Sequence, residues 1–157
     1  MEDYFLKLDG ISGESRDAKH KDEIQLVSFA WGVTKPSDGG SATGRGAGRP
    51  TFEDFRFTMD VNRASPQLFL AGASGKHIKE AQLSVRRAGK VQLEYLKIKF
   101  TDVLVTSFEE VAGGEAPTET VGFKFARIEL EYTPQQATGG PAAGIKAGWD
   151  LSKNTKI

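Results

Sequence analysis

Apolar and polar residues alternate along much of the chain with a period of two residues. The clearest run places four apolar residues at every second position: Phe55, Phe57, Met59 and Val61. Alternate residues lie on the same face of a β-strand, so this run predicts a strand with one buried face and one face in water. Leu83 and Val85 repeat the pattern.

Three longer apolar stretches change parity partway along, within residues 24–31, 91–100 and 121–132. A flat strand cannot do this without turning apolar side chains toward water, because a shift of one residue moves every side chain to the opposite face. Bulges or sharp bends at barrel corners would accommodate the change, and so would strands buried on both faces. Both interpretations predict a mainly β fold built as a closed, curved β-barrel.

One short helix is predicted between the strands. Ser65 can cap the free amides of a first helical turn, Pro66 suits the first helical position, and Gly75 can adopt the left-handed conformation that ends a helix. Between them lies a stripe of small and apolar residues: Leu68, Phe69, Ala71 and Gly72. We expect this helix to plug a barrel mouth or to line a contact between subunits.

The segment 35–50 is rich in glycine and contains no large apolar residue, so it predicts a long mobile loop. Loops of this length inside a compact domain are usually functional. A second glycine-rich stretch, residues 138–144, separates the predicted barrel from a tail that carries Ile145, Trp149 and Leu151.

Composition narrows the class of protein. At 157 residues, with 38% hydrophobic and 27% charged residues, the chain predicts one folded domain over residues 1–157. Its 21 basic and 21 acidic residues cancel, which disfavours binding to nucleic acid or to an anionic membrane.

The absence of cysteine excludes disulfides, thiol nucleophiles and thiolate metal sites. No signal peptide or membrane span is apparent, so we expect synthesis in the cytoplasm and no membrane insertion.

The sequence offers no convincing metal site or hydrolase site. His20 and His77 each lack a second ligand at metal-binding spacing, and the charged stretch around His20 predicts a solvated loop. Ser15, His20 and Asp22 supply the residue types of a hydrolase triad, but Ser15 does not stand in a strand–turn–helix nucleophile elbow. We interpret Ser15 and Asp17 as turn residues.

Two glycine-rich runs, 44–49 and 72–76, resemble phosphate-binding loops, but the first lacks a following helix and the second lacks the required spacing. The first is better interpreted as a flexible arm with two cationic side chains that can dock on an acidic surface. Glu109, Glu110 and Glu115 flank a Gly-Gly turn, which predicts a solvated hairpin. The sequence therefore predicts no enzyme activity, no cofactor and no metal.

Short blocks along nearly the whole chain resemble one protein family. They include FLKLDGI at 5–11, GES at 13–15, DEI at 22–24 and SFAWG at 28–32, followed by blocks at 65–66, 74–77, 87–89, 94–96 and 148–149. As a set they resemble the haemolysin-coregulated proteins, or Hcp family, which are tube proteins of type VI secretion systems.

The resemblance implies a closed β-barrel, similar to phage tail tube proteins, with one short helix and a long glycine-rich loop. It also implies that six copies form a ring and that rings stack head to tail into a hollow tube. Implied partners are the chain itself, the contractile sheath, the spike and baseplate proteins, and secreted effectors carried in the lumen. The tube would be expelled to the extracellular space or into a target cell.

The resemblance also suggests individual site residues. Segment 35–50 resembles the family's extended loop, which reaches the adjacent ring, and our candidates for ring stacking are Ser37, Asp38, Arg45 and Arg49. The residue before Trp31 resembles a lumen-facing site implicated in cargo contact. Here that residue is Ala30, which offers no hydroxyl and leaves the cargo specificity open.

Two other classes of function compete with the tube protein. A binding module would use the glycine-rich loop to recognise a glycan or peptide, but no aromatic residue lies between Lys35 and Pro50. An enzyme would need a nucleophile, an acid/base pair or a metal set, and the sequence places none of these together. Some family members carry an additional toxin domain; this chain stops soon after Trp149, so we expect none.

Overall fold

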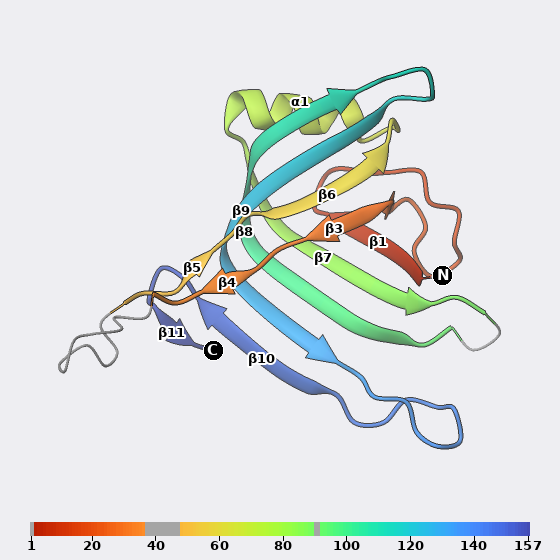
Figure 1. Cartoon of the computed structure of the whole chain (residues 1–157), viewed down its shortest axis with the longest axis vertical. Helices are drawn as coiled ribbons and strands as arrows, with labels where there is room; N and C mark the ends of the chain where they lie inside the picture. The colour runs from red at the N-terminus through yellow and green to blue at the C-terminus, as the bar shows by residue number, and fades with distance from the viewer. Residues whose placement is uncertain (1, 37–47, 90–91) are drawn as a thin grey trace.

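The computed structural model describes residues 2–36, 48–89 and 92–157. These residues form β-strands and a single α-helix (Figure 1). In chain order the elements are β1 (Glu2–Leu8), β2 (Ile24–Leu26), β3 (Ser28–Ala30), β4 (Val33–Thr34), β5 (Thr51–Phe52), β6 (Phe55–Asp60), α1 (Ser65–Ser74), β7 (His77–Arg87), β8 (Glu94–Val111), β9 (Thr118–Tyr132), β10 (Ile145–Asp150) and β11 (Thr155–Lys156).

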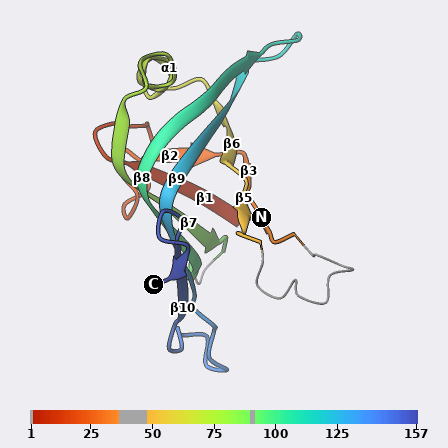
Figure 2. The same ribbon diagram turned by 90° about the vertical axis from the view of Figure 1, so that its left-hand side faces the viewer.

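Nine of the strands form one antiparallel sheet, and β4 and β5 form a separate pair. Neighbours in the large sheet follow the order β11-β10-β9-β8-β7-β1-β2, and β6 joins β9 to β3. Strand β9 is long enough to serve two neighbours on one edge: residues 118–123 pair with β6, and residues 127–132 pair with β10. The sheet is therefore strongly curved, as Figures 1 and 2 show.

The path of paired strands returns close to its starting point. Strands β2 and β3 are separated only by Val27, yet β2 pairs with β1 and β3 pairs with β6. The amide of Val27 donates a hydrogen bond to the carbonyl oxygen of Thr58 at 2.8 Å. No ladder between described strands closes the sheet. The mainly β fold with one short helix is therefore confirmed, whereas the closed barrel remains a prediction.

Each predicted change of parity coincides with an irregularity in the sheet. The first stretch is interrupted at Val27, between β2 and β3. The second contains a bulge at Tyr95, because consecutive residues of β7 pair with the residues on either side of it. Opposite the third stretch, Asp102 adopts a left-handed backbone with φ of 57°. Bends and bulges, rather than strands buried on both faces, account for these patterns.

Aromatic rings from three strands fill the centre of the core. The ring centroid of Phe55 lies 4.9 Å from that of Phe100 and 5.0 Å from that of Phe123. Phe100 also contacts Phe125, with centroids 4.9 Å apart. All four side chains are buried. The alternation predicted for residues 55–59 is confirmed, and only Val61, which follows the end of β6, is exposed.

The predicted helix is present, but its start differs from the expectation. Ala64 occupies the N-cap position, and no side chain caps the first turn. The hydroxyl of Ser65 instead donates to the carboxyl of Glu119 at 2.5 Å and accepts from the amide of Asn62 at 2.9 Å. The prediction that Ser65 caps the helix is wrong, because a buried carboxyl takes its hydroxyl. Gly75 does end the helix, with φ of 72°.

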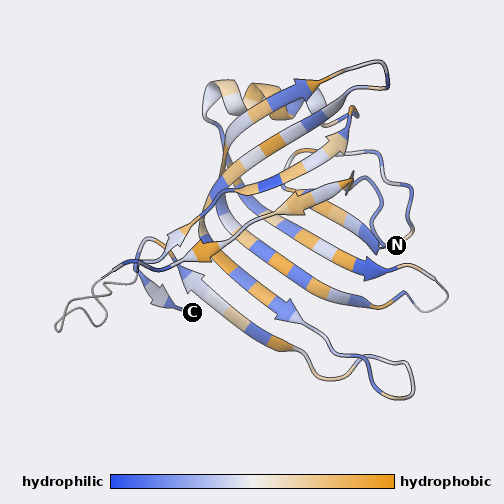
Figure 3. Ribbon diagram, in the orientation of Figure 1, coloured by the Kyte–Doolittle hydropathy of each residue, from blue (hydrophilic) through white to orange (hydrophobic). Residues whose placement is uncertain are grey.

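Helix α1 buries a narrower face than its sequence predicted. Leu68 and Ala71 are buried against the core, whereas Phe69, Leu70 and Gly72 are exposed. The ring of Phe69 packs edge to face against Phe108 of β8, with ring centroids 6.2 Å apart. The helix therefore covers one end of the curved sheet, as Figure 3 shows, and the side chains of Phe69 and Leu70 are exposed to solvent.

Gly13 lies where the segment between β1 and β2 packs tightly on itself. A Cβ atom at this position would lie 2.6 Å from the carbonyl oxygen of Glu23 and 2.8 Å from the Cα atom of Ile24. Because both neighbours are backbone atoms, we expect Gly13→Ala to lower the free energy of unfolding by about 1–3 kcal/mol. Urea unfolding measures this value. As a control, Gly113→Ala meets no atom within 4 Å; equal losses in the two variants would contradict the prediction.

Candidate functional site

The glycine-rich loop leaves the sheet on a short stem. Strands β4 and β5 pair in antiparallel fashion, and Gly48 lies against the ring of Pro36. The stem lies to one side of the large sheet (Figure 1). Of the residues predicted to mediate stacking, Arg49 is described and exposed. Ser37, Asp38 and Arg45 lie outside the described residues.

Ala30 lies on a polar face of the sheet. It pairs with Arg56 of β6, which pairs with Gly122 of β9. Directly opposed residues of antiparallel strands share a face, so Arg56 stands between two residues with little or no side chain. Ala30 and Arg56 also line a shallow pocket, together with Trp31, Phe52, Glu53 and Asp54.

The same face is hydrophilic farther along the strands. Thr58 pairs with Ser28 on one side and with Thr120 on the other, and the hydroxyls of Thr58 and Thr120 lie 3.3 Å apart. The alternate residues of these strands carry the aromatic core. This part of the sheet is thus a wall with one apolar and one hydrated face, and the alternating colours of Figure 3 show the pattern.

A second surface is apolar and lies on β9 and β10. Trp149 pairs with Ile128, and Ile145 pairs with Tyr132 at the other end of the same face. Ile128 is buried, whereas Tyr132 is 42% exposed and Ile145 is 66% exposed. We call these residues, with Leu130 between them, the β9–β10 apolar face. Sequence reasoning did not find it, although the alternation of Ile145, Ala147 and Trp149 was an available signal.

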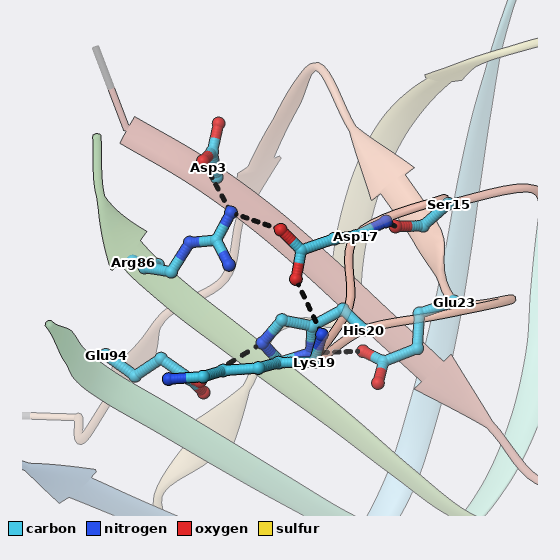
Figure 4. A network of polar contacts seen from close by, with 8 residues as sticks. All are labelled: Asp3, Ser15, Asp17, Lys19, His20, Glu23, Arg86 and Glu94. Carbon is cyan, nitrogen blue, oxygen red and sulfur yellow. Dashed lines mark hydrogen bonds and ion pairs between the residues drawn. The ribbon is translucent and has the colours of Figure 1, made fainter. Parts of the chain in front are cut away.

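A polar network lies beneath the segment that joins β1 to β2 (Figure 4). Arg86 of β7 is only 3% exposed. Its Nη2 atom lies 2.7 Å from Oδ2 of Asp17 and 3.0 Å from Oδ2 of Asp3. The hydrogen bond from Arg86 lowers the pKa of Asp17 to about 2. The guanidinium carbon also lies 5.0 Å from the ring centroid of Phe5, within cation–π range.

His20 is the second cation of this network when it is protonated. It is 5% exposed and stacks on Phe5, with ring centroids 4.4 Å apart and planes 10° apart. Its Nδ1 atom lies 3.0 Å from Oε1 of Glu23, and its Nε2 atom lies 3.2 Å from Oε2 of Glu94. The expectation that His20 lies in a solvated loop is wrong, because the ring packs against a buried aromatic residue.

The structure does not assemble the hypothetical hydrolase triad. Both ring nitrogens of His20 face glutamate oxygens, as described above. The hydroxyl of Ser15 accepts a hydrogen bond from the amide of Asp17, and a carboxyl oxygen of Asp17 accepts one from the amide of Lys19. The interpretation of Ser15 and Asp17 as turn residues is confirmed, and Asp22 is exposed.

Glu119 is a further titratable residue that sequence reasoning missed. It is 2% exposed and accepts the hydrogen bond from Ser65. Burial raises the pKa of Glu119, and the neighbouring carboxyl of Glu110 adds to the rise. These two glutamates pair across β8 and β9. Glu109 and Glu115 are exposed, as expected for a solvated hairpin.

Among residues 2–36, 48–89 and 92–157, no group of three or more histidine, aspartate or glutamate side chains is placed to hold a metal ion. His77, for example, contacts only the carboxyl of Asp102 among the ion pairs of this part of the chain. None of the helical residues described forms a helix long and apolar enough to cross a membrane.

Comparison with known proteins decides the family. A family model described as "Type VI secretion system effector, Hcp" matches residues 5–132. The chain belongs to the Hcp family. Protein hcp1 of Pseudomonas aeruginosa is 35% identical over 158 aligned residues, which cover 98% of each protein. The crystal structure of Hcp1 from Salmonella typhimurium is 38% identical, with a TM-score of 0.83 and 99% of each chain covered.

A further solved structure, described as that of a type six secretion system protein, has a TM-score of 0.92 at 30% identity and covers both chains fully. The Hcp resemblance that the sequence blocks indicated is therefore confirmed. Hcp proteins are structural components of type VI secretion, and the mainly β fold with one short helix is the fold that this chain shares with the solved Hcp structures.

Proposed function

We propose that the chain is the ring-forming subunit of a type VI secretion tube. Six copies close into a ring, and rings stack head to tail into a hollow tube that a contractile sheath expels. The observation that carries the proposal is the β9–β10 apolar face, on which Tyr132 and Ile145 are exposed. A neighbouring copy that covers this face removes apolar area from water, which contributes roughly 25 cal/mol per Å².

Two unlike apolar surfaces lie at opposite ends of the molecule. Helix α1, with Phe69 and Leu70 exposed, lies at one end of the long axis, and the β9–β10 apolar face lies toward the other (Figure 1). Copies that associate through unlike surfaces form heterologous contacts, which generate closed rings or open filaments. This arrangement supports assembly of many copies, since a like-to-like contact would stop at a dimer.

We further propose that the barrel closes through residues 24–30, which act as one bent strand. In this arrangement Val27 continues the path from β2 to β3 instead of interrupting it. Its hydrogen bond to Thr58 supports this view, because it extends the pairing with β6 toward β2. Closure would leave the sheet without an open edge at this point.

The polar face that carries Ala30 and Arg56 lines the lumen in this proposal. Its hydroxyl and charged side chains, repeated in six copies, would give a hydrated channel wall. Ala30 itself presents only a methyl group, so effectors held in the lumen would contact the polar groups around it. Arg56 stands closest in register and is exposed.

The assembled tube would contact the sheath, the spike and the baseplate, and would carry effectors out of the cell. The chain would be made in the cytoplasm and released through the secretion machine, with no nucleic-acid partner and no membrane insertion. The equal numbers of acidic and basic residues disfavour binding to nucleic acid or to an anionic membrane. The resulting near-zero net charge also leaves little repulsion between copies, which favours self-association.

Deletion of residues 37–48 tests the stacking role of the loop. The deletion spares every strand of the large sheet, so we expect rings to form while tube growth is lost. Light scattering measures the ring mass, and negative-stain microscopy counts tubes under conditions in which the unaltered protein forms them. Replacing the same segment with glycine and serine of equal length separates the role of loop length from that of Ser37, Asp38 and Arg45. Long tubes from the deletion variant would contradict the prediction.

A further inference from the structure

Two ionic contacts join the segment between β1 and β2, residues 9–23, to strands β7 and β8. Asp17 contacts Arg86 of β7, and His20 contacts Glu94 at the start of β8. Elsewhere the segment is held by Glu14, whose carboxylate accepts a hydrogen bond from the amide of Arg63 at 3.0 Å, and by the buried side chain of Ile11. The two ionic contacts therefore fix the part of the segment around Asp17 and His20 against the sheet (Figure 4).

The geometry of His20 favours one protonation state. Both of its ring nitrogens face carboxylate oxygens, Glu23 at 3.0 Å and Glu94 at 3.2 Å. The contact with Glu94 lies off the direction of a hydrogen bond and is an ion pair. A neutral imidazole carries one N–H and one lone pair, so it would direct that lone pair at a carboxylate. Only the doubly protonated ring attracts both glutamates.

The charges around His20 strengthen this conclusion. One permanent cation, Arg86, is the partner of two aspartates, and the network holds four carboxylates in all: Asp3, Asp17, Glu23 and Glu94. Lys19 binds Asp17 through its backbone amide, and its side chain is exposed. Because His20 and Arg86 are both buried, water screens these charges weakly. A cationic His20 also interacts favourably with the π face of Phe5, on which it stacks.

We propose that His20 is a proton-controlled latch: its doubly protonated form holds the end of this segment, residues 18–23, closed against β8, and loss of one proton releases that end. The direction follows from the contacts, which stabilise the cation and not the neutral ring. The closed segment is therefore favoured at low pH and opens as the pH rises. Asp17 and Arg86 remain paired throughout this range, so the segment opens from its His20 end. The proposal does not depend on ring or tube assembly.

Limited proteolysis of the full chain by trypsin measures how often the segment opens, because the trypsin sites Arg16, Lys19 and Lys21 lie on the segment and are exposed. A synthetic peptide of residues 14–24, cleaved in parallel, corrects for the pH dependence of trypsin itself. The ratio of the two cleavage rates gives the population of the open segment when opening is fast. From about pH 5 to about pH 9, the range over which histidine side chains ordinarily change charge, we expect the ratio for Lys19 and Lys21 to rise at least about tenfold, because the neutral ring no longer forms its ion pair with Glu94 in this largely buried site.

Variants of the two histidines provide the matched comparison. His20→Gln keeps a polar side chain that never becomes cationic, so its ratio should be high and independent of pH. His77→Gln alters the exposed histidine that contacts Asp102, and its ratio should follow that of the unaltered protein. A constant ratio in the unaltered protein, or the same rise in His20→Gln, would overturn the latch.

Glu94→Gln serves as a second test if His20→Gln does not fold, which circular dichroism establishes. It removes one of the two carboxylates that face His20, so a neutral ring can donate from Nδ1 to Glu23 without opposing a second negative charge. The pH response should then shrink to a few-fold at most. A response as large as that of the unaltered protein would overturn the proposal.

Discussion

Ile145→Asp is expected to abolish ring assembly while leaving the monomer folded. Ile145 is 66% exposed in the monomer, so the substitution removes little packing from the core. In a ring, the same position would lie in an apolar contact, where an unpaired carboxylate is strongly unfavourable. The penalty recurs at each contact of the ring. We expect size-exclusion chromatography with light scattering to show a monomer at concentrations at which the unaltered protein forms rings.

Lys146→Asp is the control for this prediction. It introduces the same residue one position along β10, on the opposite face of the strand. The ion pair of Lys146 with Glu129 is long, at 4.0 Å, and the lysine side chain is 59% exposed, so its loss changes stability little. Rings should persist. If Ile145→Asp formed rings as readily as Lys146→Asp, the β9–β10 apolar face would not be a subunit contact.

Arg86→Met is expected to lower the free energy of unfolding by about 3–5 kcal/mol near neutral pH, because it removes one partner of a buried ionic network and leaves Asp3 and Asp17 without a cation. Methionine retains much of the aliphatic length that packs beside Phe5. Chemical denaturation measures the loss. Arg87→Met is the control, since Arg87 is exposed and lies over the ring of Tyr95 at 4.9 Å. It should lose about 1 kcal/mol or less.

The effect of Arg86→Met should also depend on pH in the acid range. Arg86 lowers the pKa of Asp17 from 3.8 to about 2, so their contact stabilises the fold fully above the ordinary value of an aspartate. That contribution is lost as the pH falls through about 2. The difference between Arg86→Met and the unaltered protein should therefore narrow between about pH 4 and about pH 2. A difference that stays constant over this range, or losses equal to those of Arg87→Met, would contradict the account.

Local features of the fold were predictable from the sequence. Alternation identified β6, and the left-handed conformation of Gly75 ended α1 as expected. The changes of parity marked bends because they record a local constraint, namely which side of each strand faces the core. The N-cap was missed because Ser65 is bonded to Glu119, which lies 54 residues away in the chain. Contacts of that range have no signature in a local pattern.

The buried polar residues show the same limit more strongly. Arg86 follows Val85 on the parity that alternation assigns to water, yet both are buried. The segment before β2 covers that position of β7, and its own turn places Asp17 against the guanidinium. The burial of His20 was not predicted for the same reason. The residue lies in a charged run of the sequence, but its partner Glu94 comes from β8. Alternation describes one sheet face at a time, so it cannot anticipate a loop that covers the other face.

The residues of the candidate site fall into two groups: those that the family resemblance suggested and those that only the structure revealed. Ala30 and the loop residues, including Arg49, came from resemblance to the family, and their roles in cargo contact and stacking stay predictions. The exposed part of the β9–β10 apolar face begins where the core ends. Ile128 and Tyr132 lie on the same strand, but Ile128 is buried and Tyr132 is exposed. The sequence alone contains both residues but not that boundary.

The central claim, that the chain assembles into rings, is tested most directly by negative-stain electron microscopy of the purified protein at high concentration. We predict ring-shaped particles with a central hole and six-fold symmetry in class averages. A field that contained only particles of monomer size would contradict the claim.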